Sequence, residues 1–156
     1  MNYVTIKNTD DAKYRTKAAL SLLGFDYGLK RIGVAVGQEL TGTASALLTV
    51  RANDGKPDWA TISKLISQWQ PDELVVGLPL NMDGSFHELS YRAQRFGNQL
   101  HGRYSLPVHF MDERLSSLDA EQELKGKSRK AQAADIDKVA AKIILESWLM
   151  AQQARE

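Results

Sequence analysis

The stretch GFDYGLKRIGVAV, from Gly24 to Val36, places a carboxylate where one apolar segment ends and a tight turn begins. Apolar residues before Asp26 and after Arg31 predict two strands, and YGLKR between them predicts the loop of an antiparallel hairpin. Three roles are open for Asp26: a turn-forming residue, part of a phosphate-binding loop, or a ligand in a metal site.

The composition favours one domain in a reducing cytoplasm. The chain has 156 residues, 43% of them hydrophobic, which is enough for one core and short for two. With no cysteine, disulfides and thiolate chemistry are excluded, and a metal would need carboxylate, imidazole or water ligands. No secretory signal or membrane span is recognisable, so no membrane partner is expected. Because 20 Lys and Arg balance 19 Asp and Glu, a nucleic-acid partner must be argued from local clusters.

The rest of the chain predicts a mixed sheet covered by helices. Residues 1–17 are polar and aperiodic, so we expect a flexible N-terminal extension before one domain at 18–156. ASALLTV predicts a third strand, ELVVGLPL a buried parallel fourth and LPVHFM a fifth.

Apolar positions at three- and four-residue spacing predict helices at about 57–69, 87–104 and 136–152, and one more helix is expected before the last. Pro57 suits a first helical turn. Three antiparallel strands followed by strand–helix–strand crossovers give an α/β fold, a mixed five-stranded sheet with helices on its faces.

Carboxylates gather at the ends of the predicted strands, where open sheets of this kind place their chemistry. Asp26 ends the first strand, and Asp112 and Glu113 follow the fifth in HFMDERLSS. Because successive strand residues face opposite ways, only one of Asp112 and Glu113 should enter a shared site. Asp137 is expected at the start of the last helix.

Small residues could bring that last helix close to the sheet. Ala140 and Ala141 lie three and four positions after Asp137, on roughly the same helical face. Three carboxylates close together repel one another unless a cation compensates, and oxygen ligands of this kind suit Mg²⁺ or Mn²⁺. Such ions support hydrolysis of a phosphodiester. Ordinary turn, cap and surface roles remain an equal interpretation of the same acids.

Two loops could hold a nucleic-acid backbone. GLPLNMDGS, from Gly77, has glycines that permit close backbone approach and side chains that can donate to phosphate, although a simple strand-to-helix loop with Ser85 as cap is as good an interpretation. KGKSRK, residues 125–130, is basic and either grips a backbone or is solvated surface. The candidate substrate contacts are Lys30, Arg31, Asn81, Ser85, Arg114, Lys127, Arg129 and Lys130, and Arg92 and Arg95 could extend this track.

Four segments, FDYGLKRIGVAVG, VVGLPLNMDGS, MDERLSS and DKVAAKIILES, together resemble the YqgF/RuvX family. These bacterial RNase H-like proteins are described both as Holliday junction resolvases and as pre-16S rRNA nucleases. The resemblance runs from Leu20 to about Leu149. It implies an RNase H-like three-layer fold and dependence on Mg²⁺ or Mn²⁺. It also implies that Asp26, Glu113 and Asp137 are the catalytic and metal-binding acids.

The chain departs from the wider superfamily in its fourth strand. Related resolvases and ribonucleases often carry an acid at the end of that strand, whereas VVGLPLN has none until Asp83. The second ligand would then come from the DER element. Asp112 is an alternative to Glu113 there, and Asp135 is an alternative to Asp137.

The resemblance implies a nuclease that processes the 5′ end of pre-16S rRNA during ribosome biogenesis. Its partner would be structured RNA, and the chain would act as a monomer or homodimer. One alternative is Holliday junction resolution on branched DNA, which needs a dimer for paired cuts. A second is a non-catalytic nucleic-acid-binding module. A third is ATP binding, because sugar kinases, Hsp70 and actin use a similar hairpin, but they need two domains and this chain has room for one.

Overall fold

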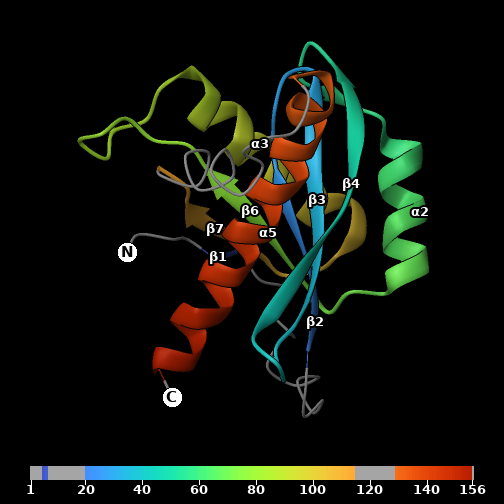
Figure 1. Cartoon of the computed structure of the whole chain (residues 1–156), viewed down its shortest axis with the longest axis vertical. Coiled ribbons are helices and arrows are strands. Elements are labelled where there is room, and N and C mark those ends of the chain that lie inside the picture. Colours follow the sequence, from blue (N-terminus) through green and yellow to red (C-terminus); the bar gives the residue numbers. More distant parts are fainter. Residues whose placement is uncertain (1–4, 7–19, 115–128, 156) are drawn as a thin grey trace.

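The computed structural model describes residues 5–6, 20–114 and 129–155, with side chains at 20–114 and 135–154. These residues form a mixed sheet of seven strands in the order β1-β7-β6-β2-β3-β4-β5, with helices on both faces (Figure 1). The elements are β1 Thr5–Ile6, β2 Ser21–Asp26, β3 Arg31–Gln38, β4 Thr43–Asn53, β5 Lys56–Pro57, α2 Trp59–Trp69, β6 Glu73–Leu78, α3 Glu88–Tyr104, β7 Val108–Asp112 and α5 Arg129–Arg155.

The direction of the strands determines where the chain can build a site. β2, β3 and β4 form an antiparallel meander, whereas β6 runs parallel to both β2 and β7. The carboxyl ends of β2, β6 and β7 therefore meet at one edge of the sheet. All six residues of β6 are buried, as expected for a central strand covered on both faces.

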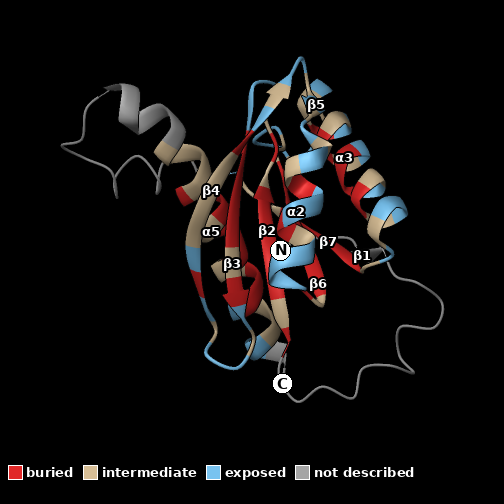
Figure 2. Cartoon of the chain, turned by 90° about the vertical axis from the view of Figure 1, so that its right-hand side faces the viewer, coloured by how far each residue is buried: buried red, intermediate tan, exposed pale blue. Residues whose placement is uncertain are grey.

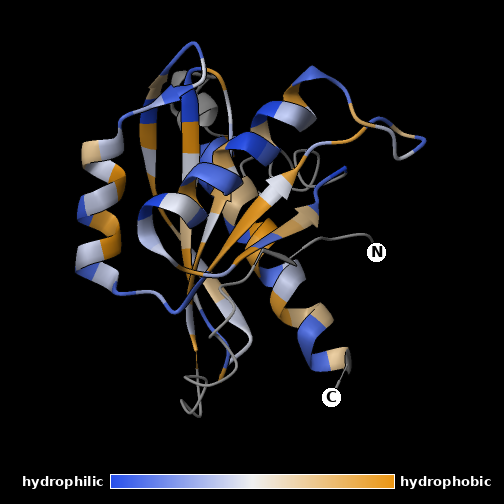
Figure 3. Ribbon diagram, turned by 180° about the vertical axis from the view of Figure 1, so that it is seen from behind, coloured by the Kyte–Doolittle hydropathy of each residue, from blue (hydrophilic) through white to orange (hydrophobic). Residues whose placement is uncertain are grey.

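Two apolar cores lie between the sheet and its helices, one on each face of the sheet. On one face, Ile62 and Leu65 of α2 and Phe96 of α3 join side chains from the sheet. Figure 2 shows the buried residues concentrated along the central strands, and Figure 3 shows the apolar side of α2 turned toward the sheet. On the other face, Ile144 and Leu145 of α5 pack against a second set of sheet residues.

Helix α5 lies unusually close to the sheet because glycines line its path. A Cβ at Gly33 of β3 would overlap the backbone carbonyl of Asp137. A Cβ at Gly37 would lie 2.8 Å from Leu145 Cδ2. Buried Ala140 and Ala141 complete the close face of the helix, as their small size predicted.

The five predicted strands are confirmed, and two short strands join them. β5 pairs with β4 across a turn in which Asp54 and Gly55 both have positive φ, 48° and 81°. β1 pairs with β7 and falls within the N-terminal extension. The remainder of that extension lies outside the described residues. Within the described parts of the chain, no helix is long and apolar enough to cross a membrane.

Two local predictions need correction. Pro57 belongs to β5, and α2 begins at Trp59 because the Asp58 side chain accepts a hydrogen bond from the Thr61 amide. Asp137 does not begin the last helix: α5 starts at Arg129 and places Asp137 in its interior. The helix expected between the fifth strand and the last helix would fall at 115–128, outside the described residues.

Candidate active site

Asp26 and Glu113 meet at the edge where the parallel strands end. Asp26 is the last residue of β2, and Glu113 directly follows β7, where its amide donates to the Leu78 carbonyl of β6 (3.3 Å). The two carboxyl groups are hydrogen-bonded to each other across the end of β6. They share a cavity of about 310 Å³, whose other walls are Tyr27, Pro79, Leu80, Leu89, Arg114 and Ala140.

The electrostatics of this pair are those of two acids competing for one proton. The pKa of Asp26 is raised to about 7, mainly by burial; the hydrogen bond with Glu113 opposes this rise, and the charge of Asp137 adds a smaller increase. Burial, followed by the charge of Asp26, raises the pKa of Glu113 well above its usual value. Without a cation, the pair therefore holds a shared proton more tightly than two isolated carboxyl groups would.

Gly77 makes room for the second acid. It lies within fully buried β6, and a Cβ there would stand 2.5 Å from Glu113 Oε2 and would also overlap the Ile144 side chain of α5. The glycine that the sequence suggested for close approach to a phosphate thus accommodates a protein carboxylate. A lone glycine inside an apolar strand was the available signal, because such glycines often mark close packing.

Asp137 stands beside this pair, on α5. Its carboxylate accepts a hydrogen bond from Arg31 Nε at 2.6 Å, in an ion pair across the β3–α5 contact. Burial raises the pKa of Asp137, and the Arg31 guanidinium opposes that shift. Its alternative, Asp135, instead pairs with Lys138 at 3.2 Å along the same helix.

The arrangement can be tested for its fit to a divalent ion. Among the described residues, no three His, Asp or Glu side chains converge tightly enough to hold a metal together. Asp26 and Glu113 are nevertheless two oxygen donors whose repulsion only a shared proton now relieves, and hard cations such as Mg²⁺ or Mn²⁺ select such ligands. The pair therefore fits a divalent ion. Asp137 would join it only after leaving Arg31.

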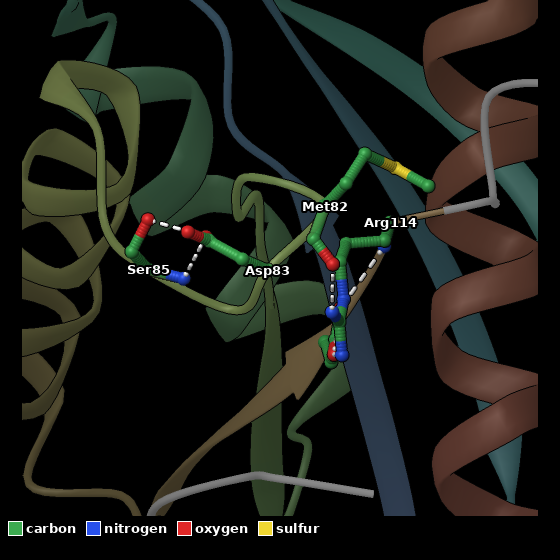
Figure 4. Close-up of polar contacts among 5 residues, drawn as sticks. Met82, Asp83, Ser85 and Arg114 are labelled. Atoms are coloured by element: carbon green, nitrogen blue, oxygen red, sulfur yellow. Dashed lines mark hydrogen bonds and ion pairs between the residues drawn. The ribbon is translucent and has the colours of Figure 1, made fainter.

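Asp112, the residue before Glu113, does not line the cavity that Asp26 and Glu113 share. It accepts hydrogen bonds from Arg114, at 2.6 Å from Nη2 and 2.9 Å from Nε. Arg114 also donates from Nη1 to the Met82 carbonyl at 2.9 Å, which ties the end of β7 to the loop after β6 (Figure 4). Glu113 is thus the member of the DER element that meets Asp26.

The loop after β6 is tied by its own hydrogen bonds. Asn81 Nδ2 donates to Ser85 Oγ (2.9 Å), and the Ser85 hydroxyl and amide donate to Asp83 (2.6 and 2.9 Å; Figure 4). These bonds from Ser85 hold the pKa of Asp83 below its usual value. Ser85 does not cap α3, because His87 occupies the cap position.

The other predicted contacts with substrate divide by location. Lys30 is exposed in the β2–β3 turn, and Arg31 is exposed at the start of β3. Lys127 lies outside the described residues, and the side chains of Arg129 and Lys130, in the first turn of α5, are not described. Tyr27 of the β2–β3 hairpin also lines the cavity and packs on Phe96 of α3, and it was not among the residues predicted from the sequence.

These features define a class. The chain has an RNase H-like three-layer fold. Its paired carboxylates lie at the carboxyl ends of parallel strands, and helix α5 brings a third acid beside them. The structure of T. thermophilus RuvC with a Holliday junction substrate matches with a TM-score of 0.51 at 17% identity, covering 86% of this chain and 96% of that one. The fowlpox virus resolvase with its junction DNA has a TM-score of 0.54 at 12% identity, covering 85% and 99%. At these identities the likeness shows the fold alone.

The particular family follows from the sequence comparison. The family described as "RuvX: Holliday junction resolvase" matches residues 20–151, and the chain belongs to it. A relative from Aeromonas hydrophila subsp. hydrophila is 54% identical over 134 residues, covering 85% of this chain and 96% of its own. One from Pseudomonas putida is 52% identical over 133 residues, covering 83% and 94%. Both carry the name "Putative pre-16S rRNA nuclease".

Proposed function

We propose that the protein is a divalent-metal-dependent nuclease that hydrolyses phosphodiester bonds at the 5′ end of precursor 16S rRNA in the cytoplasm. The observation that carries the chemistry is the hydrogen-bonded Asp26–Glu113 pair, open to a cavity at the carboxyl ends of the parallel strands. Support for an RNA substrate comes from the names of relatives that are more than half identical.

The residues of the chain divide the work of such a reaction. Asp26 and Glu113 would hold Mg²⁺ or Mn²⁺ after losing their shared proton. The bound ion would supply an activated water and neutralise charge on the phosphate. Lys30 and Arg31, exposed on the hairpin beside Asp26, would attract the backbone of the substrate. Once a substrate phosphate has drawn Arg31 away from Asp137, the Asp137 carboxylate would become available as a further oxygen ligand beside Asp26 and Glu113.

Resolution of Holliday junctions is the second candidate, and two observations favour it. The family carries the resolvase description, and resolvases with bound junctions share the fold. A resolvase makes paired cuts and therefore works as a symmetric dimer. RNA cleavage by a monomeric protein would therefore favour rRNA processing over junction resolution.

Two parallel cleavage assays distinguish the two candidate functions. Purified protein with Mn²⁺ is incubated with a fragment spanning the 5′ end of pre-16S rRNA and, separately, with a four-way DNA junction. We expect cleavage of the RNA and an intact junction. Cleavage of the junction alone would make resolution the function, and no cleavage of either would favour a non-catalytic binding module.

A further inference from the structure

A second cavity adjoins the active site on the α3 side of the sheet. It has a volume of about 370 Å³, within the range of about 300–1,000 Å³ that small-molecule sites occupy. The β4–β5 turn forms one wall and the exposed side of α3 forms another, and Figure 2 shows β5 lying beside α3. Tyr27, the residue after Asp26, lines both cavities, so the two are neighbours.

Positive charge dominates the walls of this second cavity. Lys56, Arg92 and Arg95 line it against one acid, Asp54, which is largely exposed. Arg92 is partly neutralised, because its Nη2 lies 3.4 Å from Glu88 and its Nη1 lies 4.0 Å from Asp54. Lys56 and Arg95 are exposed and make no hydrogen bond or ion pair with the described residues. Two cations thus remain available to an anionic ligand.

The walls are held in place before any ligand arrives. The Tyr27 hydroxyl donates to the Gly55 carbonyl at 2.6 Å, and Arg92 Nη1 donates to the Asp54 carbonyl at 3.4 Å. Together these bonds fasten the β4–β5 turn to the hairpin and to α3. A preformed site loses less entropy when it orders a ligand.

Trp59, an aromatic residue in the cavity wall, is not available to stack on a nucleic-acid base. Trp59 packs on Phe96 with ring centroids 5.8 Å apart and carries the Arg103 guanidinium 4.0 Å from its ring centroid. The cavity is therefore better suited to a phosphate and its sugar than to an intercalated base. The Gln99 amide on α3 can both donate to and accept from a sugar or base edge.

We propose that this cavity binds a phosphate and sugar of the substrate strand, a short distance along the strand from the phosphodiester cut at Asp26. Lys56 and Arg95 would contact the phosphate, and Gln99 would contact the sugar. Cationic side chains around a pocket next to the reaction site are the pattern expected where backbone contacts fix the register of a strand. The assignment rests on the proposed function, because it takes Asp26 as the point of cleavage.

The test measures binding apart from cleavage. In the Asp26→Asn background, single-stranded RNA and DNA of one sequence are titrated by fluorescence anisotropy against Arg95→Glu and, as control, Lys64→Glu. Both variants change the charge by the same amount on exposed helix positions, but Lys64 lines neither cavity. We expect Arg95→Glu to weaken binding about tenfold or more and to lower the slope of log affinity against log salt by about 0.7 per lost contact. Lys64→Glu should stay within about twofold.

Each outcome has one meaning. Equal affinities for the two variants, or no binding of either strand, would overturn the cavity assignment. A larger loss for RNA than for DNA would identify an RNA strand as the source of the phosphate, and the reverse would identify DNA. If the wild-type protein cleaves RNA while Arg95→Glu binds normally, the proposed function survives and the cavity assignment fails. If Arg95→Glu loses binding but the wild-type protein cleaves nothing, the reverse holds.

Discussion

Asp26 and Glu113 lie on either side of the end of β6 and are stable together only because a proton, or a cation in its place, reduces their repulsion. That balance has a measurable consequence in the protein without metal. Burial raises the pKa of Asp26 from 3.8 to about 7, so the folded protein binds this proton more tightly than the unfolded chain does. The resulting stabilisation is complete below about pH 4 and is lost as pH rises through about 7.

The variant Asp26→Asn should therefore change stability in a pH-dependent way. The amide cannot ionise, so with a chelator present we expect the variant to be more stable than the wild-type protein at pH 8, by a few kcal/mol at most. At pH 5 the advantage should be less than half as large, and it should vanish only below about pH 4. Urea unfolding at both pH values measures the difference, and an equal difference at both would contradict a raised pKa at Asp26.

At the scale of elements, the site depends on how closely β6, β7 and α5 approach one another. Strand-end placement was enough to predict that Asp26 and an acid of the DER element lie at one edge, because parallel strands bring their carboxyl ends together. The choice of Glu113 over Asp112 came only from the family resemblance. The role of Gly77 could not be predicted in the same way. Only the packed structure shows that Glu113 and α5 both occupy the space a side chain would need.

Replacing Gly77 by alanine should damage both stability and activity. The added methyl would force the Glu113 carboxylate and the Ile144 side chain aside, and overpacking of this kind costs about 1–3 kcal/mol. Thermal unfolding and RNA cleavage measure the two effects. Gly102→Ala is the matched control, because a Cβ there meets nothing within 4 Å. Because Gly102 lies in the last turn of α3, the change should be neutral or stabilise by no more than about 0.5 kcal/mol. Equal effects at the two glycines would contradict the close-approach account.

At the scale of the whole molecule, apolar periodicity predicted the five main strands and placed α3 to within a residue. It could not predict β1 or β5, because two-residue strands carry no periodic signal and exist only through their partners. The start of α5 was also missed, since the residues before the apolar repeat are polar. The cavity beside α3 was invisible in the sequence because its walls come from segments more than 30 residues apart, as Asp54 and Arg92 illustrate.

A buried polar pair in the sheet, Glu73 of β6 and His109 of β7, packs against α5. His109 Nε2 lies 2.6 Å from Glu73 Oε1, both side chains are 5% exposed, and Trp148 of α5 stacks on the His109 ring at 4.2 Å. Replacing His109 by alanine removes this hydrogen bond and the buried ring on which Trp148 stacks. His109→Ala is therefore expected to lower the free energy of unfolding by about 2–5 kcal/mol, measured by urea titration.

A double replacement provides the control for that prediction. Changing both Glu73 and His109 to leucine replaces two hydrogen-bonded polar side chains by apolar ones and leaves no large cavity, so it should cost less stability than His109→Ala alone. A double variant less stable than the single one would show that the hydrogen-bonded pair itself contributes more than the volume of the His109 ring.

Single-turnover cleavage of the pre-16S rRNA fragment in Mn²⁺ measures whether Asp26 takes part in metal-dependent cleavage. Asp26→Asn should slow cleavage by at least about 100-fold, because replacing even a residue that only hydrogen-bonds to a metal ligand lowers activity by about 10–100-fold. The control Asp58→Asn removes an equal charge and preserves the cap of α2, because Asn caps as well as Asp, so it should cleave at the wild-type rate. Undiminished cleavage by folded Asp26→Asn would contradict the account.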